Sequence, residues 1–145
     1  MTPPPATTPI GLQLARTARV VGQAFDRVMA EAGGSASTWQ VLLLVRSQNS
    51  GTQSAMAERL GITGATLTHH LNSLEERGLV RRWREASNRR VQRVELTDAG
   101  TELFLRLREV ALRHDQRLRA ELTPAETEQL GELLDRLEAS VRPPA

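Results

Sequence analysis

Two adjacent histidines, His69 and His70, attract attention first, because imidazole can bind a metal ion or transfer a proton. They lie in a stretch with helical spacing, where consecutive residues point about 100° apart, so they cannot hold one ion together. Ligands that share an ion along a helix stand three or four positions apart. None of the residues at those positions is His, Cys, Asp or Glu. Because G-x-S-x-G and H-E-x-x-H motifs are also absent, the sequence predicts no metal site, no catalytic residue and no cofactor.

The helix that carries these histidines, about 64–77, has an apolar side and a polar side. Leu67, Leu71 and Leu74 fall on one stripe and indicate the side that faces the core. The opposite side is small and polar, which suits entry into the major groove of DNA, where donors and acceptors meet base edges. We therefore expect a recognition helix, with DNA-binding residues Gly64, Ala65, Thr66, Thr68, His69, Asn72 and Ser73.

Three polar residues of this helix have individual predictions. His69 can donate to or accept from the N7 or O6 atom of a purine, and Asn72 can pair with adenine. His70 lies at the margin of the apolar stripe, where a packing role is expected.

Arginines gather directly after this helix. Residues 1–93 have a charge balance of +6 and residues 94–145 a balance of −4, and stretch 81–93 holds six Arg against the single Glu85. Such a patch suits a polyanionic partner, although a charge run can also be a solvated surface. On a hairpin beside a recognition helix, arginines can reach phosphates or the minor groove. We expect DNA contacts from Arg84, Asn88, Arg89 and Arg90.

Length and composition limit the architecture that positions these residues. A chain of 145 residues suits one domain with a hydrophobic core. The absence of cysteine excludes disulfides and thiolate metal sites. No apolar run is long enough for a membrane span. The start, MTPPPATTPI, has no secretory pattern and predicts a disordered tail over 1–8, and a cytoplasmic location is the default.

Helical spacing and capping residues predict six helices and one hairpin. Ser35, Thr52 and Thr63 are expected N-caps, and Gly61 and Gly78 are expected to close the helices before them. The sequence TPAE at 123–126 combines an N-cap with a proline and a capping glutamate. The expected helices are about 9–32, 36–48, 53–60, 64–77, 97–120 and 124–142, with strands within 79–85 and 90–96. The predicted fold class is mainly α, a winged helix–turn–helix with a two-stranded β wing and additional terminal helices.

Three stretches resemble the MarR family of transcriptional regulators. They are TWQVLLLV (38–45), TQSAMAERLGITGATLTHHLNSLEERGLVRR (52–82) and NRRVQRVELTDAG (88–100). The resemblance covers roughly 35–100 closely, and the helix order covers most of the rest. It implies a homodimeric winged-helix repressor or, less often, an activator, with a small effector, often phenolic or aromatic, bound between the dimerisation helices and the DNA-binding lobe.

In terms of this resemblance the chain divides into functional segments. Residues 35–97 would form the winged helix–turn–helix lobe, and 9–34 and 98–142 would supply dimerisation helices. An intrachain core is the alternative for the apolar residues of those helices. The expected dimer interface comprises Leu14, Val21, Phe25, Leu130, Leu133, Leu134 and Leu137.

The sequence also departs from the family pattern. Asn88 replaces the usual wing Asp, so the usual Asp–Arg pair can at best be a neutral hydrogen bond. Ala55 replaces a common Glu, and His69 replaces a frequent Arg, which should change base preference. Cysteine-based peroxide sensing is excluded, and the lack of Trp in the first helix weakens a urate-sensor interpretation.

The resulting prediction is a sequence-specific regulator of transcription, a repressor that binds double-stranded DNA as a homodimer on a pseudo-palindromic operator and that a small ligand can release. One alternative is a winged-helix module that binds proteins and not DNA. Another is an enzyme with a distributed active site. Trp39 could line an effector pocket or belong to the core.

Overall fold

Local signals in the sequence set most of the helix ends. The computed structural model describes residues 7–48 and 52–144. Thr52 and Thr63 cap the helices that follow them, with their hydroxyl oxygens accepting from the backbone N–H of Ala55 and Thr66. The predicted tail 1–8 falls largely outside the described residues, as does the stretch 49–51 that follows the second expected helix.

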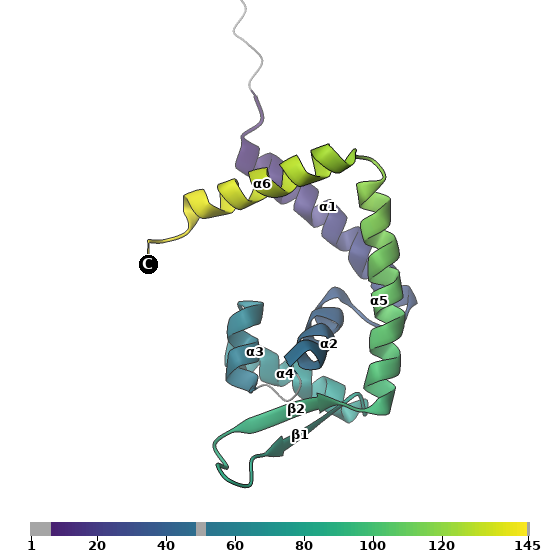
Figure 1. Ribbon diagram of the computed structural model, residues 1–145, viewed down its shortest axis with the longest axis vertical. Coiled ribbons are helices and arrows are strands. Elements are labelled where there is room, and N and C mark those ends of the chain that lie inside the picture. The colour runs from purple at the N-terminus through teal and green to yellow at the C-terminus, as the bar shows by residue number, and fades with distance from the viewer. Residues whose placement is uncertain (1–6, 49–51, 145) are drawn as a thin grey trace, which may run out of the picture. The chain divides into compact units, whose positions relative to one another are not determined.

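The element order agrees with the prediction. The described residues form α1 (Ile10–Glu31), α2 (Ala36–Gln48), α3 (Gln53–Leu60), α4 (Gly64–Glu76), β1 (Val80–Arg84), β2 (Gln92–Leu96), α5 (Asp98–Arg119) and α6 (Pro124–Val141) (Figure 1). This order of a helix–turn–helix, a two-stranded antiparallel hairpin and terminal helices confirms the predicted winged helix–turn–helix fold. None of the described helices is both long and apolar enough to cross a membrane.

Contacts divide the chain into two compact units, Met1–Val110 and Ala111–Ala145. The core of the first unit lies where α2, α3 and α4 meet the first half of α5 and the hairpin. Its largest fully buried side chains include Leu42, Met56, Leu67, Leu71 and Leu107. These residues come from four helices, so the apolar stripe of α4 is held in place by several elements at once.

The hairpin extends beside α3 and α4 (Figure 1). Val80 pairs with Leu96 at its base and Arg84 with Gln92 near its tip. Val94 is 1% exposed and anchors β2 to the core. An isolated bridge between Thr52 and Arg93 also joins the start of α3 to β2.

A tight joint connects the end of α4, the hairpin and the start of α5. Gly78 has a φ of 72°, a conformation in which glycine lacks the steric cost of other residues. The Thr97 hydroxyl donates to the Gly78 carbonyl at 2.6 Å and accepts from the Gly100 N–H at 3.1 Å. A Cβ atom on Gly100 would lie 1.9 Å from the Leu79 carbonyl oxygen, so this position has space only for glycine.

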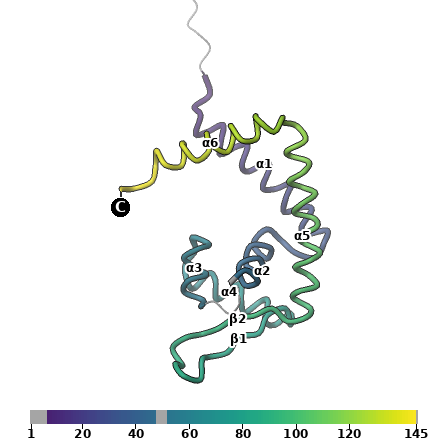
Figure 2. Tube along the Cα trace, in the orientation of Figure 1, coloured from purple at the N-terminus to yellow at the C-terminus, as the bar shows by residue number. Residues whose placement is uncertain are grey.

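The second unit contains the end of α5, a short turn and α6 (Figure 2). The predicted capping box is present, because Thr123 accepts from the Glu126 N–H and Glu126 accepts from the Thr123 N–H. No residue of α6 is buried, and Leu130, Leu133, Leu134 and Leu137 are all exposed.

Candidate nucleic-acid interface

The two sides of α4 have the orientation that the sequence predicts. Leu67, Leu71 and Leu74 are buried, with at most 3% of their surface exposed. All the predicted DNA-binding residues of this helix are exposed, and His70 at the margin of the core is half-buried. The exposed set comprises Gly64, Ala65, Thr66, Thr68, His69, Asn72 and Ser73.

The adjacent histidines diverge as helical geometry requires. The ring centroids of His69 and His70 are 6.1 Å apart and their planes differ by 59°. Across the described parts of the chain, no three His, Cys, Asp or Glu side chains converge as metal ligands would. The histidines therefore belong to two different environments, one facing solvent and one beside the core.

Asn88 organises the turn of the hairpin in place of the usual aspartate. Its Oδ1 atom accepts from the Arg90 N–H at 3.2 Å, and its carbonyl accepts from the Val91 N–H at 3.0 Å. Arg84 Nη1 donates to the Arg89 carbonyl at 2.8 Å. These neutral and charge-assisted bonds fix the backbone that carries the side chains of Arg89 and Arg90. Arg84 therefore has a structural partner of its own, which the sequence interpretation did not include.

The six arginines of stretch 81–93 separate into two groups. Three of them form ion pairs with glutamates: Arg81 with Glu95, Arg82 with Glu75, and Arg93 with Glu85. Arg84, Arg89 and Arg90 are exposed and form no ion pair with any described residue. The net positive charge of the hairpin is thus concentrated near its tip. A count along the sequence assigns only Glu85 to this stretch and cannot show the pairing with Glu75 and Glu95.

Arg82 connects β1 to the recognition helix. Its Nη2 atom donates to Glu75 Oε1 at 3.2 Å and also to Asn72 Oδ1, while Nε donates to Glu75 Oε2 at 3.3 Å. This hydrogen bonding from the Arg82 side chain lowers the pKa of Glu75 below its usual value. The Arg82 side chain is only 13% exposed, so it supports the neighbouring helix more directly than it faces solvent.

A hollow of about 380 Å³ lies where α3, α4 and the hairpin meet. The predicted residues Gly64, Thr68, Arg84 and Arg90 line it together. The start of α3 lines it as well, through Thr52, Gln53 and Ser54, which the sequence interpretation missed. The N-cap at Thr52 was a usable signal, because the first helix of a helix–turn–helix crosses the DNA backbone and helix N-termini favour anions.

Trp39 belongs to an aromatic cluster within the first unit. Its ring stacks on Phe104 with a centroid distance of 5.2 Å, and the Arg46 guanidinium lies 4.9 Å from the centre of the Phe104 ring. Trp39 is half-buried. It therefore packs from α2 against α5.

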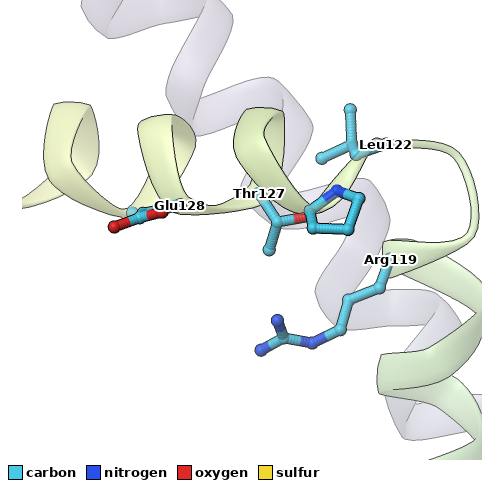
Figure 3. A pocket seen from close by; sticks show the side chains of 6 residues that line it. Arg119, Leu122, Thr127 and Glu128 are labelled. Carbon is cyan, nitrogen blue, oxygen red and sulfur yellow. The ribbon is translucent and has the colours of Figure 1, made fainter.

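A second hollow, of about 420 Å³, lies at the turn between α5 and α6 (Figure 3). Arg119, Leu122, Thr127 and Glu128 line it, and the Arg119 guanidinium pairs with Asp115 at 2.7 Å. None of the predicted site residues lies here.

The fold and this surface define a winged helix–turn–helix protein. Comparison with known proteins adds that a model of the MarR family matches residues 35–91. A putative transcriptional regulatory protein for the hcr operon of Thauera aromatica is 30% identical over 129 residues, which cover 88% of this chain and 78% of that protein. The uncharacterized HTH-type transcriptional regulator YdgJ of Bacillus subtilis is 34% identical over 90 residues, but the match spans only 53% of YdgJ and 62% of this chain.

A solved structure of a repressor has the same fold over nearly the whole chain. The transcriptional repressor CouR, bound to a 23-mer DNA duplex, is 30% identical with a TM-score of 0.83, covering 90% of this chain and 92% of that one. CouR from Rhodococcus jostii RHA1 bound to p-coumaroyl-CoA is 25% identical with a TM-score of 0.76, covering 88% of this chain and 90% of that one. The chain belongs to the MarR family, a family of transcriptional regulators and not of enzymes.

Proposed function

We propose that this protein represses transcription by binding double-stranded DNA, as a homodimer, at a pseudo-palindromic operator. The observation that carries the proposal is the exposed polar side of α4 lying beside a hairpin tip whose arginines have no carboxylate partner among the described residues. A slim polar helix suits the major groove, and exposed guanidinium groups suit phosphates or the minor groove. The DNA-bound structure of CouR supports this use of the fold.

The hollow between α3, α4 and the hairpin is the proposed binding site for a phosphate group of the DNA backbone. Two helix N-termini and the side chains of Arg84 and Arg90 meet there. Helix N-termini carry partial positive charge, and arginine adds bidentate donors, so the hollow favours a phosphate group. Phosphate contacts give affinity and register, while base contacts give sequence choice.

Base recognition is assigned to the exposed face of α4. His69 lies in the second turn of α4 and is exposed, so it is the proposed reader of a purine edge. Arg89 and Arg90 are assigned to the minor groove or its phosphates. The other proposed contacts are Gly64, Ala65, Thr66, Thr68, Asn72, Ser73, Arg84 and Asn88.

Dimerisation is assigned to the terminal helices. Leu14 in α1 and four leucines of α6 are exposed in the single chain. Because each of these leucines is only 37–46% exposed, covering the rest of it is worth about 0.5–1.5 kcal/mol, and a two-fold interface that covers all of them in both chains is favoured. Such a dimer would place two recognition helices in successive major grooves, about 34–36 Å apart.

A small aromatic or phenolic effector is the proposed signal for release. The complex of CouR with p-coumaroyl-CoA supports a ligand of this class. The ligand would have to bind more tightly to a dimer whose helix spacing does not fit DNA, because only differential affinity shifts a conformational equilibrium. The proposed location is the cytoplasm, with the protein on the nucleoid when DNA-bound.

The experiment that tests the proposal selects bound duplexes from a random pool and then measures affinity at several salt concentrations. We expect a pseudo-palindrome with two half-sites. Arg90→Ala should weaken binding to all duplexes and flatten the slope of log K against log salt by about one unit. His69→Ala should instead change which sequence is preferred. A monomer that protects one isolated half-site would refute the dimeric operator, and an equal loss on all duplexes for His69→Ala would refute its base-reading role.

The main alternative remains a winged-helix module that binds a protein partner. It requires that no duplex shifts in a gel at low salt and that partner binding is insensitive to salt. The three paired arginines make the hairpin flank close to neutral, but the unpaired arginines at the tip favour DNA over a neutral protein surface.

A further inference from the structure

The contact between Arg82 and Asn72 fixes what the recognition helix can offer to a base. A guanidinium group has five N–H donors and no acceptor, so only the amide oxygen of Asn72 can face it. Arg82 Nη2 donates to that oxygen, Oδ1. The orientation of the amide is therefore determined by chemistry, and the Nδ2 group of Asn72 is the part left over for another partner.

Arg82 itself is held in place. Its Nε and Nη2 atoms each donate to a carboxylate oxygen of Glu75, at 3.3 and 3.2 Å. Glu75 and Asn72 stand three positions apart on α4, and so lie on the same side of that helix. Because the Arg82 side chain is only 13% exposed, it has little freedom to leave either partner.

Asn72 remains exposed on α4, and its Nδ2 group forms no hydrogen bond with any described residue. An asparagine that pairs with adenine needs both amide edges, the oxygen to accept from N6 and the nitrogen to donate to N7. Here one of the two lone pairs of the oxygen is taken by a cationic donor that Glu75 holds in place, and this positive charge disfavours a second donor at the same oxygen. Asn72 is therefore better placed to donate to a base than to accept from one.

We propose that Arg82 makes Asn72 a donor-only reader and so selects guanine at the base pair facing it. Guanine presents N7 and O6 side by side as two acceptors, whereas thymine presents the single acceptor O4 beside a methyl group, adenine presents one acceptor beside a donor, and cytosine presents a donor. This proposal rests on the proposed DNA binding and revises the expected pairing of Asn72 with adenine. Arg82 is a positioning residue in this scheme, because it acts on the base only through Asn72.

The test compares base preferences in selected duplexes for four variants of the full-length chain. Asn72→Ala identifies the position, as the one at which its preference differs from that of the wild type. At that position the wild type should favour guanine over adenine by about tenfold. Arg82→Met keeps the apolar stem but loses the donors, so adenine should become at least as good as guanine. Asn72→Asp keeps an acceptor for Arg82 but has no N–H to donate, so the guanine preference should disappear and cytosine should gain.

The matched control is Arg81→Met, the neighbouring arginine on the same strand, which pairs with Glu95 and not with α4. It should leave the preference at this position unchanged. Thermal unfolding of each variant separates a local change from unfolding, and Asn72→Asp tests the proposal independently if Arg82→Met is unstable. Adenine preferred by the wild type, an unchanged preference in Arg82→Met or Asn72→Asp, or no affected position in Asn72→Ala would each overturn the inference while leaving DNA binding intact. Failure of the wild type to bind any duplex would instead refute the proposed function.

Discussion

Helices α4 and α6 have similar sequence patterns but opposite environments. Each carries leucines at helical spacing and begins with a threonine cap. The α4 leucines at 67, 71 and 74 are buried within the chain, whereas the α6 leucines at 130, 133, 134 and 137 are 37–46% exposed. The difference shows that an apolar stripe predicts that a helix face will be covered but does not say by what. In α4 the chain itself covers the stripe and leaves the polar side for the proposed DNA contacts, while α6 leaves its stripe for the proposed partner subunit.

The largest expected effect is on dimerisation, through the exposed leucines of α6. Leu134→Asp should leave the monomer folded but raise the dissociation constant of the proposed dimer by about 100-fold or more. The substitution removes apolar contact and would place an unpaired carboxylate in the interface, and two-fold symmetry counts both losses twice. Sedimentation velocity over a concentration series measures it, with Glu132→Gln on the same helix as the control. A dimer of unchanged affinity would assign the α6 leucines to another role.

Substitution in the buried leucine stripe of α4 should affect the stability of the folded chain. Leu71→Ala should lower the free energy of unfolding by about 2–5 kcal/mol, because the side chain is fully buried and its removal leaves a cavity. Urea denaturation measures this loss, at protein concentrations low enough to keep both variants and the wild type monomeric. Leu134→Ala is the matched control, and in the monomer it should cost far less. Equal costs in the monomer would contradict the distinction between the two helices.

The N-caps of α4 and α6 should contribute nearly equally to stability. Thr63→Ala and Thr123→Ala should each lower stability by about 1 kcal/mol, because each hydroxyl accepts from the backbone N–H three residues later at 3.1 Å. Thr123→Ser, which keeps the hydroxyl, should recover most of the loss. The effect of Thr63→Ala should also appear in DNA binding, since the start of α4 carries proposed contacts. Chemical unfolding measures the stability loss of each variant, and gel shifts show whether Thr63→Ala also weakens DNA binding.

The smallest expected effect is the loss of stability at acidic pH when Glu75 and Glu126 are protonated. The pKa of Glu75 is lowered by hydrogen bonding from Arg82, and that of Glu126 by hydrogen bonds from the backbone and side chain of Thr123. Because both folded-state pKa values lie below those of the unfolded chain, the stabilisation is complete above about pH 4.3 and is lost as pH falls through the folded-state values. Glu75→Gln and Glu126→Gln should each be less stable than the wild type at pH 7, with a difference that shrinks toward pH 3. A constant difference across this range in urea unfolding would contradict the assignment.

Sequence patterns predicted the local features and missed the pairings between distant residues. The caps at Thr52, Thr63 and Thr123 depend on residues three positions apart, so they could be predicted directly. The Arg82–Glu75 and Arg81–Glu95 pairs depend on the register of the two strands and on how the hairpin packs against α4. No short sequence pattern encodes either of these. For the same reason, the identity of the wing residues was predictable, but the separation of paired from unpaired arginines was not.

The site shows the same division. The exposed side of α4 follows from its buried leucines, so its residues could be named from the sequence. The participation of Thr52, Gln53 and Ser54 requires the start of α3 to meet the hairpin, which only the folded arrangement brings about. The same holds for the orientation of Asn72, because its partner Arg82 lies on a different element.

The joint between α4 and α5 has a mechanical consequence. Gly100 lies so close to the Leu79 carbonyl, and Thr97 holds Gly78 so firmly, that there is no slack between the end of one helix and the start of the other. The α5 helix of 22 residues is about 33 Å long. We therefore expect a tilt of α5 to move the carboxyl end of α4 with it, because the joint at Gly78 and Gly100 has little room to absorb the change.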